Sequence, residues 1–491
     1  MALAQWLGLA YEAGGEDAGG LVPEPFMTAL PDLSAAELAK AYRDRSLSPV
    51  EVTRAVLDRI AACEPKINAM YVVAADQALA AARAAEARFG SGAPLSALDG
   101  VPATVKENIA TEGDPCPVGV PIADMTPRAA DSPVPARLRE AGVVITGKTT
   151  MPDYGMLSAG LSSLHGVTRN PWNLAKNPAG SSSGAGAAGA AGYGPLHIGT
   201  DIGGSVRLPA AHCGLFGLKP SLGRVPIHPP FLGRVAGPMT RTVADSAALM
   251  TVISRPDPRD FMDLPYDAVD YAEGLDGLAP KGLKIGLLTE MPAGLPADPA
   301  IVAAVRAAAG ALAAEGAEIV EINGFLTPDM LDGMCRFFEA RSYSDIVDLP
   351  EDRKSRLLPY IVEWATWRAK NFTGTDVMRA YGAVQAMREA SVKATQPFDF
   401  VLSPVTCPVS YAAEAHSPTD DPHRALEHIP FTVASNMSEQ PAASVNWTFH
   451  TDGMPIGVQV IGRRFDDRGV MRMSRVLEQL RPAQKAWPAL S

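Results

Sequence analysis

The 491-residue sequence predicts an α/β fold built around a large, mostly buried β-sheet. Short apolar runs alternate with amphipathic or alanine-rich segments of helical length, and this alternation continues along the whole chain. Hydrophobic residues make up 47% of the sequence and charged residues 20%, which is typical of a compact globular protein. Because large α/β enzymes can fold as one unit, we predict a single domain over residues 1–491, with a less well-defined N-terminal extension over 1–30.

The N-terminal half begins with helices and continues with alternating strands and helices. Ser48 is predicted as a helix N-cap, with Pro49 in the first turn and Glu51 completing a capping box. The predicted elements are helices over 48–62 and 74–89, a strand over 101–107, a helix over 131–142, a strand over 143–145, a helix over 184–192 and a strand over 196–200.

The C-terminal half resumes the alternation after a Pro-, Asp- and Gly-rich segment over 256–281, which we predict to be a surface connection. The predicted elements are a βαβ-like unit over 284–288, 298–315 and 318–322, strands over 400–403, 443–446 and 456–461, and a helix over 467–480.

Charge and cysteine content exclude several classes of function. The formal net charge of −11 argues against nucleic acid or an anionic membrane as the main partner, since both require clustered basic side chains. The five cysteines are scattered and never form a CxxC pair, which favours reduced thiols in the cytoplasm over disulfides or a zinc site. The N-terminus lacks the basic region of a secretory signal, and no apolar run is long enough for a membrane span.

The stretch GSSSGAGAAG, residues 180–189, contains a GxGxxG pattern. A dinucleotide-binding turn needs a strand before its first glycine and an acidic residue about 20 positions further on. Here residues 170–178 have the composition of a loop, and Asp201 lies 12 residues after Gly189. A phosphate-binding P-loop is also disfavoured because no GK[ST] ends the glycine run. A nucleotide-binding or scaffold protein with structural serines remains an alternative of another class.

A second glycine-rich turn, TDIGGSVRLP over 200–209, places a serine where it could act as a nucleophile. The glycines before Ser205 allow a tight turn whose N–H groups, from Ile202 through Ser205, could stabilise an oxyanion. Ser205 could instead be the N-cap of a helix. A serine nucleophile needs a base, and Lys106 ends the apolar strand VPATV, where burial would lower its pKa. Lys106 could otherwise be a solvated lysine paired with Glu107.

Three motifs together resemble the amidase signature enzymes: GVPATVKEN, AGSSSGAGAAGAAG and TDIGGSVRLPAAHCGLFGLKPS. The resemblance continues in GPMTRTVAD and GMPIGVQVIG and covers most of the chain from about Leu33, with a signature core over about 95–225. The 24 residues between Ser181 and Ser205 match the spacing of that family. The resemblance implies the amidase signature fold, a large mixed central β-sheet covered by helices on both faces.

The resemblance also implies a Ser–cis-Ser–Lys triad, in which Ser205 is the nucleophile, Ser181 is the bridging serine after a cis peptide bond, and Lys106 is the base. Further residues follow from the same motifs: Ile202, Gly203 and Gly204 with Ser205 as the oxyanion hole, Ser182 as an auxiliary serine, and Asp201 with Arg207 as a supporting charge pair. The sequence departs from the family pattern at Ala179 and Ser183, where glycine is common, and at Glu107, where aspartate is frequent.

The implied activity is hydrolysis of the C–N bond of a small or medium-sized linear or cyclic amide, through an acyl-enzyme and without a metal or organic cofactor. We expect Gly155, Met156 and Asn436 to bind substrate, with Phe431 and Trp447 as further candidates. The expected partner is a small-molecule amide, and a homodimer is one assembly that the sequence leaves open. An alternative is the glutamine-hydrolysing A subunit of a tRNA-dependent amidotransferase, although the region after Lys219 lacks segments that we associate with that subunit.

Overall fold

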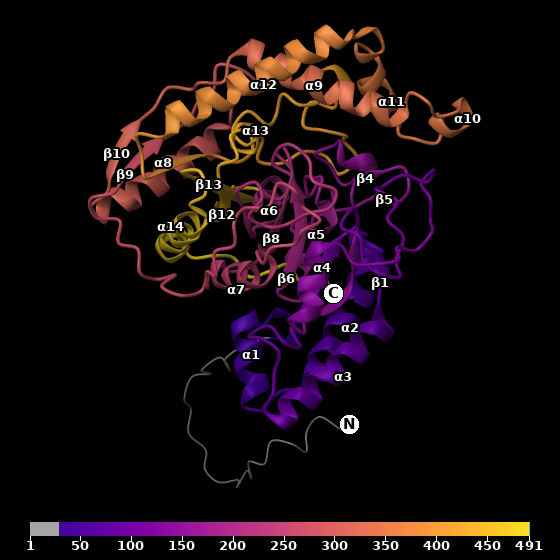
Figure 1. Ribbon diagram of the computed structural model, residues 1–491. Coiled ribbons are helices and arrows are strands. Elements are labelled where there is room, and N and C mark those ends of the chain that lie inside the picture. The colour runs from indigo at the N-terminus through magenta and orange to yellow at the C-terminus, as the bar shows by residue number, and fades with distance from the viewer. Residues whose placement is uncertain (1–28, 491) are drawn as a thin grey trace, which may run out of the picture.

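The computed structural model describes residues 29–490, and within them a mixed sheet of eleven strands runs through the molecule (Figure 1). Neighbouring strands are parallel along β3–β2–β6 and along β11–β9–β10, and antiparallel between all other neighbours. From one edge to the other the strands are β1 (Met70–Val73), β3 (Val144–Thr149), β2 (Pro102–Lys106), β6 (Leu196–Asp201), β8 (Val235–Thr240), β7 (Phe216–Lys219), β12 (Ala442–Phe449), β13 (Pro455–Gly462), β11 (Phe400–Pro404), β9 (Lys284–Leu287) and β10 (Glu318–Glu321).

Helices cover both faces of this sheet. Every residue of the inner strands β2, β6, β8 and β7 is buried, which requires packing on the two faces. The helices are α1 (Ala35–Arg43), α2 (Pro49–Ile67), α3 (Ala75–Ser91), α4 (Pro133–Glu140), α5 (Ser183–Ala191), α6 (Arg207–Cys213), α7 (Val243–Ile253), α8 (Pro299–Ala314), α9 (Pro328–Ile346), α10 (Glu351–Lys354), α11 (Pro359–Thr366), α12 (Gly374–Thr395), α13 (Val433–Met437) and α14 (Asp467–Leu480).

Two groups of helices matter for the site. The helices α5 and α6 pack on each other and against the sheet, α5 on β2 and β6 and α6 on β7, β12 and β13. Helices α9, α11 and α12 form a separate layer at the top of Figure 1, where α9 contacts both of the others. A short strand pair, β4 (Leu161–Ser162) with β5 (Gly166–Val167), and 3-10 turns at Leu30–Asp32, Asp153–Gly155, Ala369–Asn371 and Pro422–Arg424 complete the regular structure.

The predicted α/β alternation is confirmed, and most predicted elements end within a few residues of the observed ones. Helix α2 begins with the predicted capping box. The Ser48 side chain accepts from a backbone N–H of the first turn, and Glu51 Oε2 accepts from the Ser48 N–H at 3.0 Å. It extends to Ile67 rather than ending near residue 62. The predicted connection over 256–281 contains no helix or strand. The predicted extension over 1–30 lies, up to residue 28, outside the described residues.

The glycines of the GxGxxG pattern allow close packing of α5. A Cβ atom at Gly184 would lie 2.5 Å from the Thr150 backbone nitrogen, and one at Gly189 would lie 2.6 Å from a methyl carbon of Leu215. All nine residues of α5 are buried, and the residues before it form turns and no strand. These small residues therefore serve helix packing, and the strand that a dinucleotide-binding turn requires is missing from this part of the chain.

Candidate active site

Strands β2 and β6 are parallel neighbours, so their carboxyl ends lie at the same edge of the sheet. Lys106 is the last residue of β2, and the turn that carries Ser205 follows β6. Ser181 lies just before α5, and the peptide bond between Gly180 and Ser181 is cis, as the resemblance implies. Lys106 Nζ lies 2.8 Å from Ser181 Oγ and 3.0 Å from Thr200 Oγ1. The fold thus joins the predicted base to the predicted bridging serine.

Lys106 is fully buried, and this burial lowers the pKa of its amine to about 7, although the charges of Asp201 and Glu107 favour the protonated form. Near neutral pH a substantial fraction of Lys106 is therefore uncharged and able to accept a proton. Glu107 contacts His165 Nε2 at 2.7 Å and accepts the Gly119 N–H at 2.7 Å. Lys106 is therefore neither solvated nor hydrogen-bonded to Glu107.

Ser205 lies in the turn before α6 and faces a cavity. The helix begins at Arg207 with Val206 at its N-cap, so Ser205 is not the helix cap. The Ser205 carbonyl accepts from the Ser182 N–H at 3.2 Å, which ties the two serine-bearing turns together. Within residues 29–490 the Ser205 hydroxyl has no hydrogen-bond partner, and no hydrogen bond joins it to Ser181 Oγ.

Three N–H groups of this turn are open to an incoming oxyanion. In the described part of the chain the N–H groups of Ile202, Gly203 and Ser205 have no acceptor. Gly204 differs from the expectation, because its N–H donates to Asp201 Oδ1 at 2.8 Å. A Cβ atom at Gly204, whose φ is 129°, would lie 2.7 Å from Thr432 Oγ1, so glycine is needed there to shape the turn.

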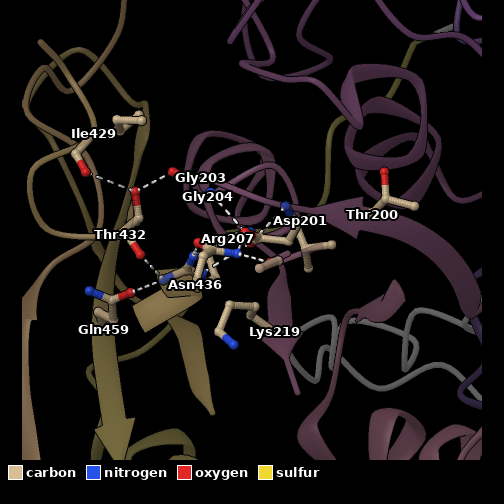
Figure 2. A network of polar contacts seen from close by, with 12 residues as sticks. Thr200, Asp201, Gly203, Gly204, Arg207, Lys219, Ile429, Thr432, Asn436 and Gln459 are labelled. Atoms are coloured by element: carbon tan, nitrogen blue, oxygen red, sulfur yellow. Dashed lines mark hydrogen bonds and ion pairs between the residues drawn. The ribbon is translucent and has the colours of Figure 1, made fainter. Parts of the chain in front are cut away.

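Asp201 and Arg207 form a fully buried ion pair that holds this turn (Figure 2). The guanidinium binds both carboxylate oxygens, with Nε to Oδ2 and Nη2 to Oδ1 each at 3.0 Å. Burial favours a higher pKa for Asp201, but the charge and hydrogen bonds of Arg207 outweigh it and hold the pKa well below its usual range. The pair is therefore a permanent charged anchor behind Ser205.

The same pair connects the turn to the C-terminal half of the chain. Arg207 also donates to the Thr432 carbonyl at 3.0 Å, Gln459 Oε1 at 2.8 Å and Asn436 Oδ1 at 2.6 Å, and Figure 2 shows these groups around its guanidinium. Asn436 Nδ2 donates in turn to Asp201 Oδ1 at 2.9 Å. The expectation that Asn436 binds substrate is wrong, because both ends of its amide are engaged in this buried network.

Ser182 supports the site without contacting Lys106. Its hydroxyl lies 3.2 Å from both the N–H and the carbonyl oxygen of Thr200, so it joins the start of α5 to the end of β6.

Ala179, one of the departures from the family pattern, has a positive φ of 61°, a conformation that favours glycine.

The cavity in front of Ser205 has a volume of about 470 Å³, counting its open mouth. Gly155 and Met156 line it, as expected, whereas the other two candidates, Phe431 and Trp447, are buried elsewhere in the core. The opposite wall was not foreseen and consists of Phe338, Arg341 and Ser342 on α9, Trp364 on α11, and Leu426 and Ile429. One helix-start signal precedes this wall, since the Thr327 side chain caps α9, whose first residue is Pro328.

Two further features of residues 29–490 concern metal ions and membranes. No group of three or more His, Cys, Asp or Glu side chains could hold a metal ion there. None of the helices in that range is both long enough and apolar enough to cross a bilayer.

Known proteins match this chain over most of its length. The family model described as Amidase matches residues 51–471. The A subunit of glutamyl-tRNA(Gln) amidotransferase from Roseiflexus castenholzii is 35% identical over 92% of this chain and 97% of its own length. An acylamidase from Rhodococcus erythropolis is 33% identical over 93% of this chain and 97% of its own length.

A solved bacterial aryl acylamidase of the amidase signature enzymes superimposes with a TM-score of 0.83 at 28% identity, covering 91% of this chain and 96% of that one. Sequence and structure therefore agree with the predicted family and fold. The chain belongs to the amidase family of amidohydrolases.

Proposed function

We propose that the protein is an amidase that hydrolyses the C–N bond of a small or medium-sized carboxylic amide through an acyl-enzyme on Ser205. The observation that carries this proposal is the 2.8 Å contact between Ser181 Oγ and Lys106 Nζ, a buried amine whose pKa is lowered to about 7. A neutral amine at this position can take a proton from Ser181.

In the proposed reaction, Ser181 passes its proton to Lys106 as it receives the proton of Ser205. The Ser205 oxygen then forms a bond to the amide carbonyl carbon, and the carbonyl π electrons move to its oxygen. The open N–H groups of Ile202, Gly203 and Ser205 stabilise this oxyanion. When the C–N bond breaks, Ser181 returns a proton to the leaving nitrogen, and Lys106 replenishes Ser181.

The acyl-enzyme is hydrolysed by the same relay. A water molecule gives its proton to Ser181 and attacks the ester carbon, and the Ser205 oxygen leaves with a proton from Ser181. Lys106 changes its protonation state and returns to the neutral form once per half-reaction. Besides the substrate and water, the proposed steps use side chains and backbone groups of this chain.

Covalent labelling with a fluorophosphonate probe tests the nucleophile. We expect the wild-type protein to be labelled once, and Ser205→Ala to lose both the label and at least about 10⁴-fold in turnover, since the nucleophile is removed. Ser183→Ala is a matched control, because this buried hydroxyl has no hydrogen-bond partner among residues 29–490 and should not be needed. Labelling or full turnover in Ser205→Ala contradicts the proposal.

A second candidate is the A subunit of a tRNA-dependent amidotransferase, which the 35% identity to the Roseiflexus castenholzii protein favours. This candidate predicts that the purified chain alone hydrolyses glutamine poorly and that a partner subunit increases the rate. The free amidase predicts turnover of simple amides by the chain alone. Hydrolysis of an amide panel by the isolated protein, with glutamine included, separates the two.

A protein with structural serines would show neither turnover nor labelling. The homodimer and the cytoplasmic location stay predictions.

A further inference from the structure

The cavity in front of Ser205 has a single charged residue in its lining. Its other side chains are apolar or small, among them Met156, Leu157 and Trp364, and none of the described lining residues is acidic. The charge belongs to Arg341 on α9, and Ser205 lines the same cavity. An arginine beside apolar side chains needs an anionic or aromatic partner to offset its loss of water.

Arg341 has no carboxylate partner in the described part of the chain. Its guanidinium lies 5.0 Å from the ring centre of Phe231, a cation–π contact that positions the charge without neutralising it. Asp345 lies one helical turn further along α9. Burial raises the pKa of its carboxyl and the charge of Arg341 opposes this shift, but the two side chains form no ion pair. By contrast, Arg336 on the same helix pairs with Asp332 at 2.7 Å.

A second polar group on this wall is also unsatisfied. The Ser342 side chain is 99% buried and lines the cavity, yet its hydroxyl has no hydrogen-bond partner within residues 29–490. A buried hydroxyl without a partner is costly, so a ligand that accepts from it is favoured. Arg341 and Ser342 therefore both contribute a hydrogen-bond donor to the lining of this cavity, and neither donor has an acceptor among the described residues.

The surrounding charge increases the attraction for an anion. Arg234 is half-buried, and its pKa is lowered to about 10, first by burial and then by the positive charge of Arg341, while the charge of Asp260 acts in the opposite direction. Its guanidinium donates to the Pro229 carbonyl and has no acidic partner in the described residues. Asp260 near Arg234 and Asp345 near Arg341 offset part of this charge, but neither carboxylate forms an ion pair with an arginine in the described residues. Both guanidinium groups are therefore available to an incoming anion.

We propose that the substrate is an amide that also carries a carboxylate, and that Arg341 and Ser342 bind this carboxylate. The inference rests on the proposed amide hydrolysis at Ser205 and names the class of substrate. A planar carboxylate matches the paired donors of one guanidinium with one hydroxyl, whereas a phosphate would use more donors than this wall offers. Glutamine fits less well than its deaminated analogue, because the lining has no acidic side chain for the ammonium group.

Monoamides of dicarboxylic acids provide the test, each compared with the neutral amide of the same length. The probes are glutaramate with pentanamide, adipamate with hexanamide, and glutamine. We expect wild-type kcat/KM to favour at least one anionic amide over its neutral counterpart about 10²-fold, and glutaramate over glutamine. Arg341→Gln should lower this preference about 10²-fold, mainly through KM, and Ser342→Ala should lower it severalfold.

A matched control and a second readout keep the test decisive. Arg336→Gln removes the same charge from the same helix outside the cavity lining and should leave the preference unchanged. Glutarate should slow fluorophosphonate labelling of the wild-type protein and should not slow that of Arg341→Gln. Equal turnover of anionic and neutral amides, with Ser205 still labelled, overturns this inference alone. Absence of both turnover and labelling overturns the proposed function together with it.

Discussion

The two sides of the cavity are built in different ways. The side that carries Ser205 comes from strand ends and helix starts between residues 102 and 207. Hydrogen bonds within the fold hold Lys106, Ser181, Ser182 and Gly204 there, whereas, in the described part of the chain, the Ser205 hydroxyl and the open N–H groups of its turn stay free for a ligand. The opposite side comes from α9, α11 and residues 426–429, whose side chains are mostly apolar. Groups that must hold a reactive geometry are fixed by hydrogen bonds and ion pairs with neighbouring side chains and backbone, whereas groups that select a ligand project from helices and can be exchanged.

Residues 429–436 link the two sides. Thr432 Oγ1 donates to the Gly203 carbonyl at 2.6 Å, and the Thr432 carbonyl accepts from Arg207. Figure 2 shows Ile429 and Thr432 next to the turn that contains Gly203 and Gly204. A change in the wall at this point should therefore reach the turn that bears the nucleophile.

The largest effect in this comparison is expected from Lys106, on the reactive side. Lys106→Ala should lower kcat about 10³-fold or more, because the proton acceptor for Ser181 is lost. Lys219→Met is the matched variant, since Lys219 is equally buried and its pKa is also lowered to about 7, but it donates to the Pro220 carbonyl. We expect it to retain turnover within about tenfold. Similar losses in both variants would mean that burial, and not the contact with Ser181, distinguishes Lys106.

The pH dependence of the wild-type protein follows from the same group. Burial lowers the pKa of Lys106, so the amine is neutral above pH about 7 and protonated below it. Because only the neutral amine accepts a proton, kcat/KM should fall about tenfold per pH unit below that value. The residual activity of Lys106→Ala should lack this limb. Circular dichroism at each pH checks that the protein remains folded.

The arrangement of the proposed reactive residues could be anticipated from the sequence, whereas the wall could not. Lys106, Ser181 and Ser205 lie in motifs whose spacing fixes their relation, and the strand that ends at Lys106 could be read from its apolar run. Asn436 was misassigned because a polar residue far along the chain gives no sign of whether it faces a cavity or a buried ion pair. The acceptor of the Gly204 N–H likewise could not be predicted from the sequence, because it is the side chain of Asp201, three residues earlier.

The wall could be predicted only as helices. The capping residue Thr327 indicates the start of α9, but the direction in which Arg341 and Trp364 point depends on how α9 and α11 pack on each other. No local pattern encodes that packing. The chemistry is thus more readable from sequence than the selectivity.

A smaller effect is expected at Ser182, which supports the reactive side without taking part in the relay. Ser182→Ala removes the hydroxyl that joins α5 to Thr200 and leaves the Thr200 N–H without its acceptor. We expect kcat to fall about tenfold and the free energy of unfolding to fall by about 1–3 kcal/mol. Steady-state kinetics with urea unfolding measures both. A loss as large as that of Lys106→Ala would make Ser182 part of the proton relay.

The smallest effect is expected at Ile429, where the wall meets the reactive turn. A Cβ atom at Gly203 would lie 3.1 Å from Ile429 Cδ1, so this methyl group packs directly over the turn that offers N–H groups to the oxyanion. Ile429→Ala enlarges the cavity there, and it should raise kcat/KM for amides with a bulkier acyl group about threefold to tenfold relative to short ones. Ile429→Val, which removes one methyl group, should shift this ratio less.

The effect of Ile429→Ala on kcat, compared with its effect on kcat/KM, shows whether the wall acts independently of the turn that carries Ser205. If the wall only selects substrate, Ile429→Ala changes the ratio of kcat/KM values while kcat for a short amide stays within about twofold. If kcat instead falls for every amide, the Ile429 side chain is needed to hold the Gly203 turn in place. In that case Ile429 belongs to the reactive side, and only the residues on α9 and α11 form the exchangeable wall.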